Sequence, residues 1–114
     1  MNPRALLLQH LARAEQLLRV VYPLSQNPKV LLDACKEIQK GIPFLLQLNL
    51  EMSVQQEAMI NEIQKIIEKH EQAPVEFSKD KRFVICSPEY DLTQLSSQNI
   101  THYLTELRSL ISHE

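Results

Sequence analysis

The chain contains a single glycine, Gly41, in 114 residues, and this scarcity limits its possible folds more than any other feature. Glycine adopts positive φ at little cost, so tight turns, phosphate-binding loops and many-stranded β folds commonly depend on it. A helical chain can instead build its connections from Asn, Ser and Pro. The sequence therefore predicts a mainly α-helical fold, without a P-loop, a dinucleotide-binding fingerprint or a nucleophile elbow.

Length and charge narrow the possibilities further. The chain has the size of one domain, which we expect to span residues 1–114. Hydrophobic residues make up 44% and charged residues 23%, which favours a packed core over disorder. The formal charge of −2 gives no strong attraction to nucleic acid or to anionic membranes. No apolar run approaches the roughly 20 residues of a membrane span, so we expect a cytoplasmic protein.

Apolar residues recur at steps of three and four along four segments, which predicts four helices. Asn2 and Pro3 open the first helix, and Pro23 is expected to end it near residues 21–22. Asn27 and Pro28 repeat the opening signal for the second helix.

The remaining helices have signals of their own. Pro43 predicts a kink or break near residues 40–43 of the second helix. Ser53 and Gln56 have the spacing of a capping box for the third. Ser96 or Ser97 is expected to cap the last helix.

The period changes between the third and last helices. Residues 75–78 and 82–86 are rich in β-branched and aromatic side chains, which is typical of strands, and residues 87–91 read as a loop. We therefore expect a short β-hairpin or extended segment packed against the helices. The predicted fold is a four-helix bundle with an up-down arrangement and this hairpin before the last helix.

The sequence contains no motif that is typical of metal binding, redox activity or nucleophilic catalysis. Cys35 and Cys86 form no C-x-x-C motif, and we interpret them as small apolar residues, with one disulfide between them left open. The histidines lie on different predicted elements, and none belongs to a Glu-x-x-His motif: His10, His70, His102 and His113. We therefore expect neither a metal nor a cofactor.

Two surface features are candidates for binding. Lys79, Lys81 and Arg82 form a local excess of positive charge between the two predicted strands. They either protect the strand edges from pairing with other chains or bind a phosphate or an acidic partner. Residues 44–50 are nearly apolar all round, so they lie either in the core or in a subunit interface. The interface residues would be Phe44, Leu45 and Leu48.

Two Arg–His pairs have the spacing of a known motif: Arg4 with His10, and Arg108 with His113. The helix order and these pairs resemble the HEPN-domain ribonucleases, small helical bundles in which an R-x4-6-H motif in a late helix supplies the cleavage site. Residues 12–18, 22–24, 73–77 and 82–85 also resemble small uncharacterised archaeal helical proteins. The resemblance implies a HEPN-like bundle, and the position of Arg4 in the first helix departs from the active pattern.

Two functions follow as hypotheses. The first is a non-catalytic interaction module that forms a homodimer or binds a protein partner through its apolar surface. The alternative is a HEPN-like RNA-cleaving or nucleotide-binding protein of a toxin–antitoxin type system. In that case Arg108 and His113, or Arg4 and His10, would act in catalysis.

Overall fold

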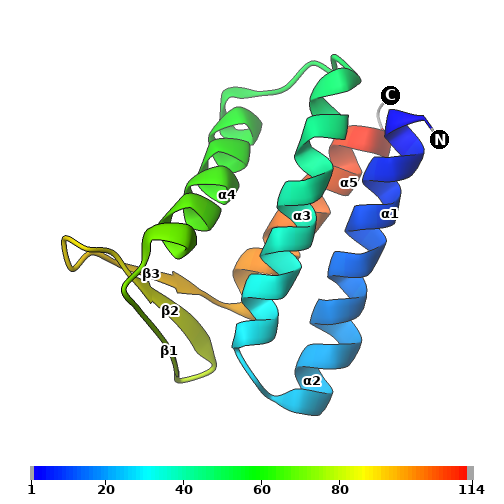
Figure 1. Ribbon diagram of the computed structural model, residues 1–114. Coiled ribbons are helices and arrows are strands. Elements are labelled where there is room, and N and C mark those ends of the chain that lie inside the picture. Colours follow the sequence, from blue (N-terminus) through cyan, green and yellow to red (C-terminus); the bar gives the residue numbers. More distant parts are fainter. Residues whose placement is uncertain (1, 113–114) are drawn as a thin grey trace.

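The computed structural model describes residues 2–112 as four long helical segments and one small sheet (Figure 1). The chain order is α1 (Pro3–Gln16), η1 (Leu17–Val21), α2 (Tyr22–Ser25), α3 (Lys29–Gln47), α4 (Val54–Gln72), β1 (Val75–Lys79), β2 (Arg82–Cys86), β3 (Leu92–Leu95) and α5 (Ser97–Ser112). Successive long helices run in alternating directions, and the sheet lies between α4 and α5 in the sequence. The mainly helical class is confirmed.

Helix α3 forms the centre of the core. In Figure 1 it lies between α1 and α4, with α5 behind it, and its contact with α1 is the most extensive between two helices. A Cβ placed on Gly41 would lie 3.0 Å from Cδ1 of Leu7 and 3.3 Å from Cβ of His10. The chain therefore uses its glycine for close packing of two helices.

The sequence predicted that the first helix ends near residues 21–22, before Pro23. This prediction is wrong. Leu17–Val21 form a π-helical segment in which the Tyr22 N–H bonds to the Leu17 carbonyl, and the helix continues to Ser25. In regular α geometry the proline ring crowds the carbonyl four residues earlier. The wider π turn relieves this crowding, so the proline is accommodated. The helix ends at Gln26, which adopts the left-handed conformation with φ of 52°.

A kink or break was expected near residues 40–43. The break is absent, because α3 continues through Pro43 to Gln47. Pro43 is exposed. A proline on the solvent side of a helix leaves the freed carbonyl of the preceding turn close to water, which reduces the cost of the missing hydrogen bond.

The predicted capping residues are confirmed for α4 and α5. Ser53 Oγ accepts from the Gln56 N–H at 3.1 Å, and Gln56 Oε1 accepts from the Ser53 N–H at 2.9 Å. Ser96 caps α5 in the same reciprocal way with Asn99, whose Oδ1 accepts from the Ser96 N–H at 2.9 Å.

The hairpin is confirmed, and a third strand joins it. Strand β2 pairs antiparallel with both β1 and β3, giving the order β1-β2-β3. Asp80 and Lys81 form a two-residue turn with φ of 51° and 64°, so the positive φ typical of such turns is adopted without glycine. Phe83 and Ile85 of β2 pack into the core. Strand β3 was not predicted, because four residues are too few to show a period.

Replacement of Gly41 by Val is expected to lower the free energy of unfolding by about 2 kcal/mol, since overpacking a tight core costs about 1–3 kcal/mol. Both atoms that the new side chain meets are close to the backbone or buried, so neither can move freely. Urea unfolding followed by circular dichroism measures the change. The matched control is Gln47→Val, at an exposed position of the same helix. Equal stability of the two variants would contradict the close α1–α3 contact.

Candidate functional site

The Arg–His pair of the last helix is only partly described. Arg108 of α5 donates from Nε to the carboxylate of Glu15 on α1, in a half-exposed ion pair. His113 lies outside the described residues. The arginine thus has a structural partner that ties the last helix to the first, and its role in catalysis stays a prediction.

The pair on α1 has a different arrangement. Arg4 and His10 are six residues apart, which places them about 120° apart around the helix at 3.6 residues per turn. His10 Nδ1 is hydrogen-bonded to Glu37 Oε2 at 3.0 Å. The His10 ring stacks on the Phe44 ring, with their centroids 5.9 Å apart. Burial acts to raise the pKa of Glu37, but hydrogen bonds with His10 and Lys40 outweigh it and lower that pKa. His10 thus helps to hold α1 against α3.

The apolar segment 44–50 divides between core and surface. Leu45 is completely buried in the core, while Phe44 and Leu48 are half-buried and pack against it. Leu46 is about half exposed, at 49%. A subunit interface here stays a prediction, and the apolar residues Phe44, Leu46, Leu48 and Leu50 retain surface for it.

Neither cysteine is paired. Cys35 is buried in α3, and burial, together with the nearby Glu62 carboxylate, raises the pKa of its thiol to about 12, so it stays protonated at neutral pH. Cys86 ends β2 as a free thiol. Among residues 2–112, no three His, Cys, Asp or Glu side chains are grouped so that they could hold a metal ion.

The basic residues lie at the β1–β2 turn, as predicted. Lys79 and Arg82 are directly opposite each other in the sheet register, and Lys81 is in the turn between them. The Tyr22 hydroxyl donates to the Lys81 carbonyl at 3.2 Å, which attaches the turn to the end of the first helix. Arg82 Nη1 donates to Gln94 Oε1 on β3 at 3.0 Å. The turn is therefore held in place while its ammonium groups remain exposed.

One face of the sheet packs on the helices, and the other is open. Because Phe83 and Ile85 point into the core and side chains alternate along a strand, their neighbours on β2 point outward with their register partners. We call this surface the outer sheet face. It consists of Val75, Phe77, Lys79, Arg82, Val84, Cys86, Leu92 and Gln94.

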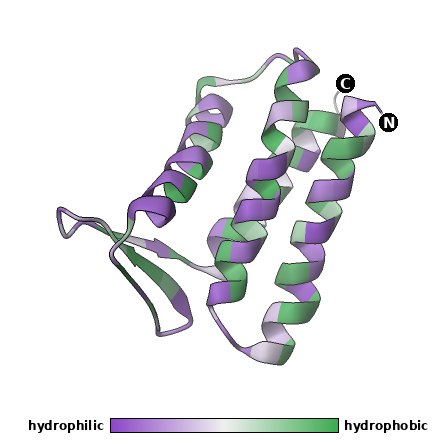
Figure 2. Ribbon diagram, viewed as in Figure 1, coloured by the Kyte–Doolittle hydropathy of each residue, from purple (hydrophilic) through white to green (hydrophobic). Residues whose placement is uncertain are grey.

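The outer sheet face is apolar at its middle and charged at its ends. Phe77 is 42% exposed and Leu92 57% exposed, although both are large hydrophobic residues. Figure 2 shows the hydrophobic residues along the strands as well as along the helices. A hollow of about 320 Å³ is lined by Phe77, Val84 and Leu92 together with Lys79 and Arg82. It is large enough to accept an apolar side chain of another molecule.

The two ends of this face have opposite charge. The turn end carries three basic side chains and Asp80. The loop between β2 and β3 is at the other end and carries Glu89 and Asp91, both exposed. Ser87 organises this loop, because its Oγ accepts from the Asp91 N–H at 3.0 Å.

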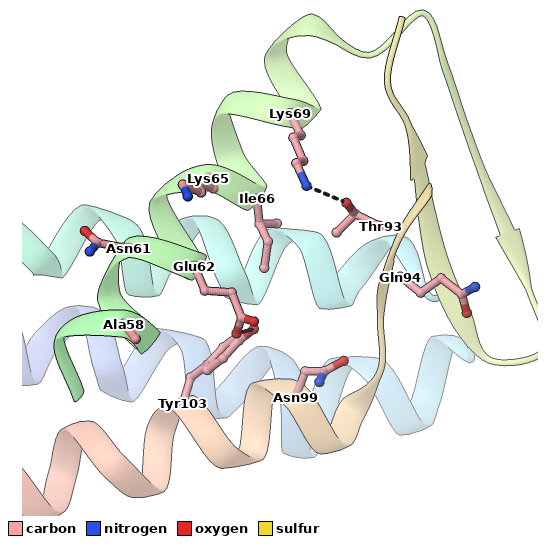
Figure 3. Close-up of a pocket in the computed structure, with 10 residues that line it drawn as sticks. All are labelled: Ala58, Asn61, Glu62, Lys65, Ile66, Lys69, Thr93, Gln94, Asn99 and Tyr103. Carbon is pink, nitrogen blue, oxygen red and sulfur yellow. Dashed lines mark hydrogen bonds between the residues drawn. The ribbon is translucent and has the colours of Figure 1, made fainter. Parts of the chain in front are cut away.

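A separate pocket of about 480 Å³ lies between α4, β3 and the start of α5 (Figure 3). Its apolar part includes Ile66, and its polar part includes Lys65 and Lys69 of α4 and Thr93 of β3. Lys69 Nζ donates to Thr93 Oγ1 at 3.3 Å, and Figure 3 shows the two side chains reaching toward each other. Gln94 also lines the pocket, although in the figure its side chain points away from it.

A buried tyrosine closes one side of this pocket. The Tyr103 hydroxyl donates to Glu62 Oε2 at 2.6 Å, and only 2% of Tyr103 is exposed. Burial is the main cause that raises the pKa of Tyr103, and the Glu62 carboxylate raises it further. Tyr103 is therefore a hydrogen-bond donor that orients Glu62, and it stays protonated.

Comparison with protein-family models, curated proteins and solved structures finds no match to this chain. Within residues 2–112, no helix combines the length and the apolar character needed to cross a bilayer. The assignment of function therefore depends on the geometry described above.

Sequence reasoning identified the basic turn but missed the apolar half of the outer sheet face and the whole pocket. Phe77 and Leu92 belong to different strands, and only the register brings them to one face. A period-two pattern in β1 was visible in Val75 and Phe77, which alternate with Glu76 and Ser78.

The buried Tyr103 should make stability depend on alkaline pH. Its folded-state pKa is raised, so its contribution is complete below the unfolded pKa of about 10 and declines as pH rises above that value. Tyr103→Phe should lower the free energy of unfolding at pH 7 by about 1.5–3 kcal/mol, the usual range for a hydrogen bond to a charged group. Between pH 10 and 11 its stability should then fall less steeply than that of the wild type.

Urea midpoints measured from pH 7 to pH 11 give both quantities. Tyr90→Phe is the matched control, because Tyr90 is 85% exposed and should reproduce the wild-type curve. Parallel curves for Tyr103→Phe and the wild type would show that Tyr103 ionises normally in the folded protein.

Proposed function

We propose that this protein is a non-catalytic interaction module that forms a homodimer through its outer sheet face. The observation that carries the proposal is an apolar sheet face, open to solvent, whose two ends have opposite charge. Exposed apolar patches framed by polar residues are typical of protein interaction sites. The described chain covers the inner face of the sheet with helices. On the outer face it leaves Phe77 and Leu92 exposed, on either side of Val84, which is only 3% exposed.

Charge complementarity favours a second copy as the occupant. In a two-fold dimer the same surface meets itself, so a self-complementary pattern is required. If the facing strands run in opposite directions, the basic turn of one copy lies over the loop with Glu89 and Asp91 of the other. Both ends of the interface then pair opposite charges, which favours this register over the parallel one.

The apolar middle would supply most of the affinity. Aromatic residues in an interface are frequent energetic anchors, and Phe77 is the exposed aromatic side chain of this face, at the middle of the edge strand β1. The hollow over Val84 would receive an apolar side chain from the facing copy. The charges at the two ends would set orientation and association rate more than affinity.

Substitution of Phe77 by Lys tests the apolar anchor. A lysine here would place a charge in the apolar part of the interface, so the dimer dissociation constant should rise at least about 30-fold, which corresponds to about 2 kcal/mol. Sedimentation velocity and native mass spectrometry at matched protein concentrations measure the change. Val54→Lys is the matched control, because Val54 is 78% exposed at the start of α4, at the end of that helix remote from the sheet, and should leave the dimer intact.

The same measurement separates the two candidate interfaces. Leu46→Lys changes the exposed apolar residue of segment 44–50 and should not affect a dimer formed by the sheet. If Leu46→Lys dissociated the dimer while Phe77→Lys did not, the interface would be that segment. A wild-type protein that stays monomeric at every concentration would refute self-association.

A charge reversal tests the orientation. Arg82→Glu should weaken the dimer about tenfold, because it places like charges at both ends of the two-fold interface. Adding Glu89→Lys to the same chain makes the ends complementary again and should restore most of the affinity. Arg19→Glu, an equal charge change at an exposed site on η1, is the control. Failure of Glu89→Lys to restore binding would argue against the antiparallel arrangement.

A further inference from the structure

The pocket between α4, β3 and α5 has an excess of free hydrogen-bond donors. The cause is that hydrogen bonds within the chain occupy acceptor atoms of the lining side chains and leave their donor groups unused. Lysine ammonium groups only donate. Thr93 Oγ1 must therefore accept from Lys69, which leaves the Thr93 hydroxyl proton free to donate elsewhere. Lys65 is one helical turn before Lys69 on α4 and adds positive charge to the lining of the pocket, although in Figure 3 its ammonium group lies on the side of Asn61.

Asn99 adds further donors for the same reason. Its Oδ1 accepts from the Ser96 N–H, which can only donate, and from the Ser96 hydroxyl at 2.9 Å. This fixes the orientation of the side-chain amide, so its NH₂ group is the part left for a ligand. Asn99 lines the pocket with the two lysines and Thr93.

Only one strong acceptor lies in this pocket among the charged side chains that line it. Glu62 Oε2 is occupied by the Tyr103 hydroxyl, and the second carboxylate oxygen remains for another donor. Tyr103 fixes the orientation of this carboxylate from the core side. The pocket therefore combines a cationic, donor-rich part with one oriented acceptor.

We propose that this pocket binds a small phosphate monoester that also carries a free hydroxyl group. A phosphate monoester has a charge near −2 and three acceptor oxygens, which match the Lys69 ammonium group and the Thr93 hydroxyl at one end of the pocket better than a carboxylate does. In Figure 3 Asn99 and Glu62 lie at the other end, where the hydroxyl of the ligand would be. The free oxygen of Glu62 would accept from the ligand hydroxyl. The volume of about 480 Å³ is sufficient for a compact metabolite of this class.

Glycerol 3-phosphate is the probe for this site, and amide NMR signals of the full chain are the readout. Titration should shift the signals of Thr93 and Asn99 in a saturable manner. Lys65→Gln combined with Lys69→Gln should weaken binding at least tenfold. The control pair, Lys29→Gln with Lys40→Gln, removes the same charge from exposed positions of α3 and should keep wild-type affinity.

Parallel titrations test the ligand class. Inorganic phosphate should bind more weakly than glycerol 3-phosphate, and acetate more weakly still. Glu62→Gln removes the repulsion between carboxylate and phosphate, so it should tighten inorganic phosphate and reduce the advantage of glycerol 3-phosphate. An unchanged ratio between the two would overturn the role of Glu62 in binding the hydroxyl.

Three outcomes would overturn the proposal as a whole. They are a response that does not saturate, equal losses in the two lysine pairs, and acetate binding as tight as that of glycerol 3-phosphate. Because these variants leave Phe77 and the charged ends of the outer sheet face unchanged, the oligomeric state is measured independently. Failure of the pocket proposal is therefore distinguishable from failure of the dimer.

Discussion

The close packing of α1 against α3 at Gly41 is the constraint on which the rest of the structure depends. Absence of a Cβ at this position lets α3 approach Leu7 and the backbone side of His10. With α1 held on one side, the other sides of α3 are left for α4, α5 and the inner face of the sheet. The dense core that results contains large aliphatic side chains that are completely buried, among them Leu11 and Ile38.

Use of the single glycine in a helix leaves the turns to other residues. Positive φ occurs at five described residues that are not glycine: Gln26, Asn49, Asp80, Lys81 and Tyr90. Each such residue costs on the order of 1 kcal/mol, so these turns need support from elsewhere. The hydrogen bond from Tyr22 to Lys81 supports one, and the bonds of Ser87 support the loop that contains Tyr90. The sheet consequently depends on the helical core for its stability.

Local signals in the sequence predicted the parts of the fold that local chemistry determines. The capping box at Ser53 and the strands around the basic turn follow from side chains within a few residues of one another, and both were recovered. The helix end expected at Pro23 was wrong, because a π turn accommodates this proline, and a break at Pro43 is absent, because this exposed proline lies within a continuous helix. Both candidate sites need tertiary contacts, namely the strand register and the approach of α5 to α4, which no local pattern contains.

Strand β3 contributes side chains to both candidate sites. Its side chains alternate, so Leu92 points to the outer sheet face while Thr93 points toward Lys69 in the pocket. A shift of one residue in the β2–β3 register would exchange these roles, burying Leu92 and removing Thr93 from the lysine. Leu95 is completely buried and fixes the register from the core side. The same packing therefore determines both the apolar face offered to a partner and the donor arrangement of the pocket, and Gln94 of β3 lines both the pocket and the hollow of the outer sheet face.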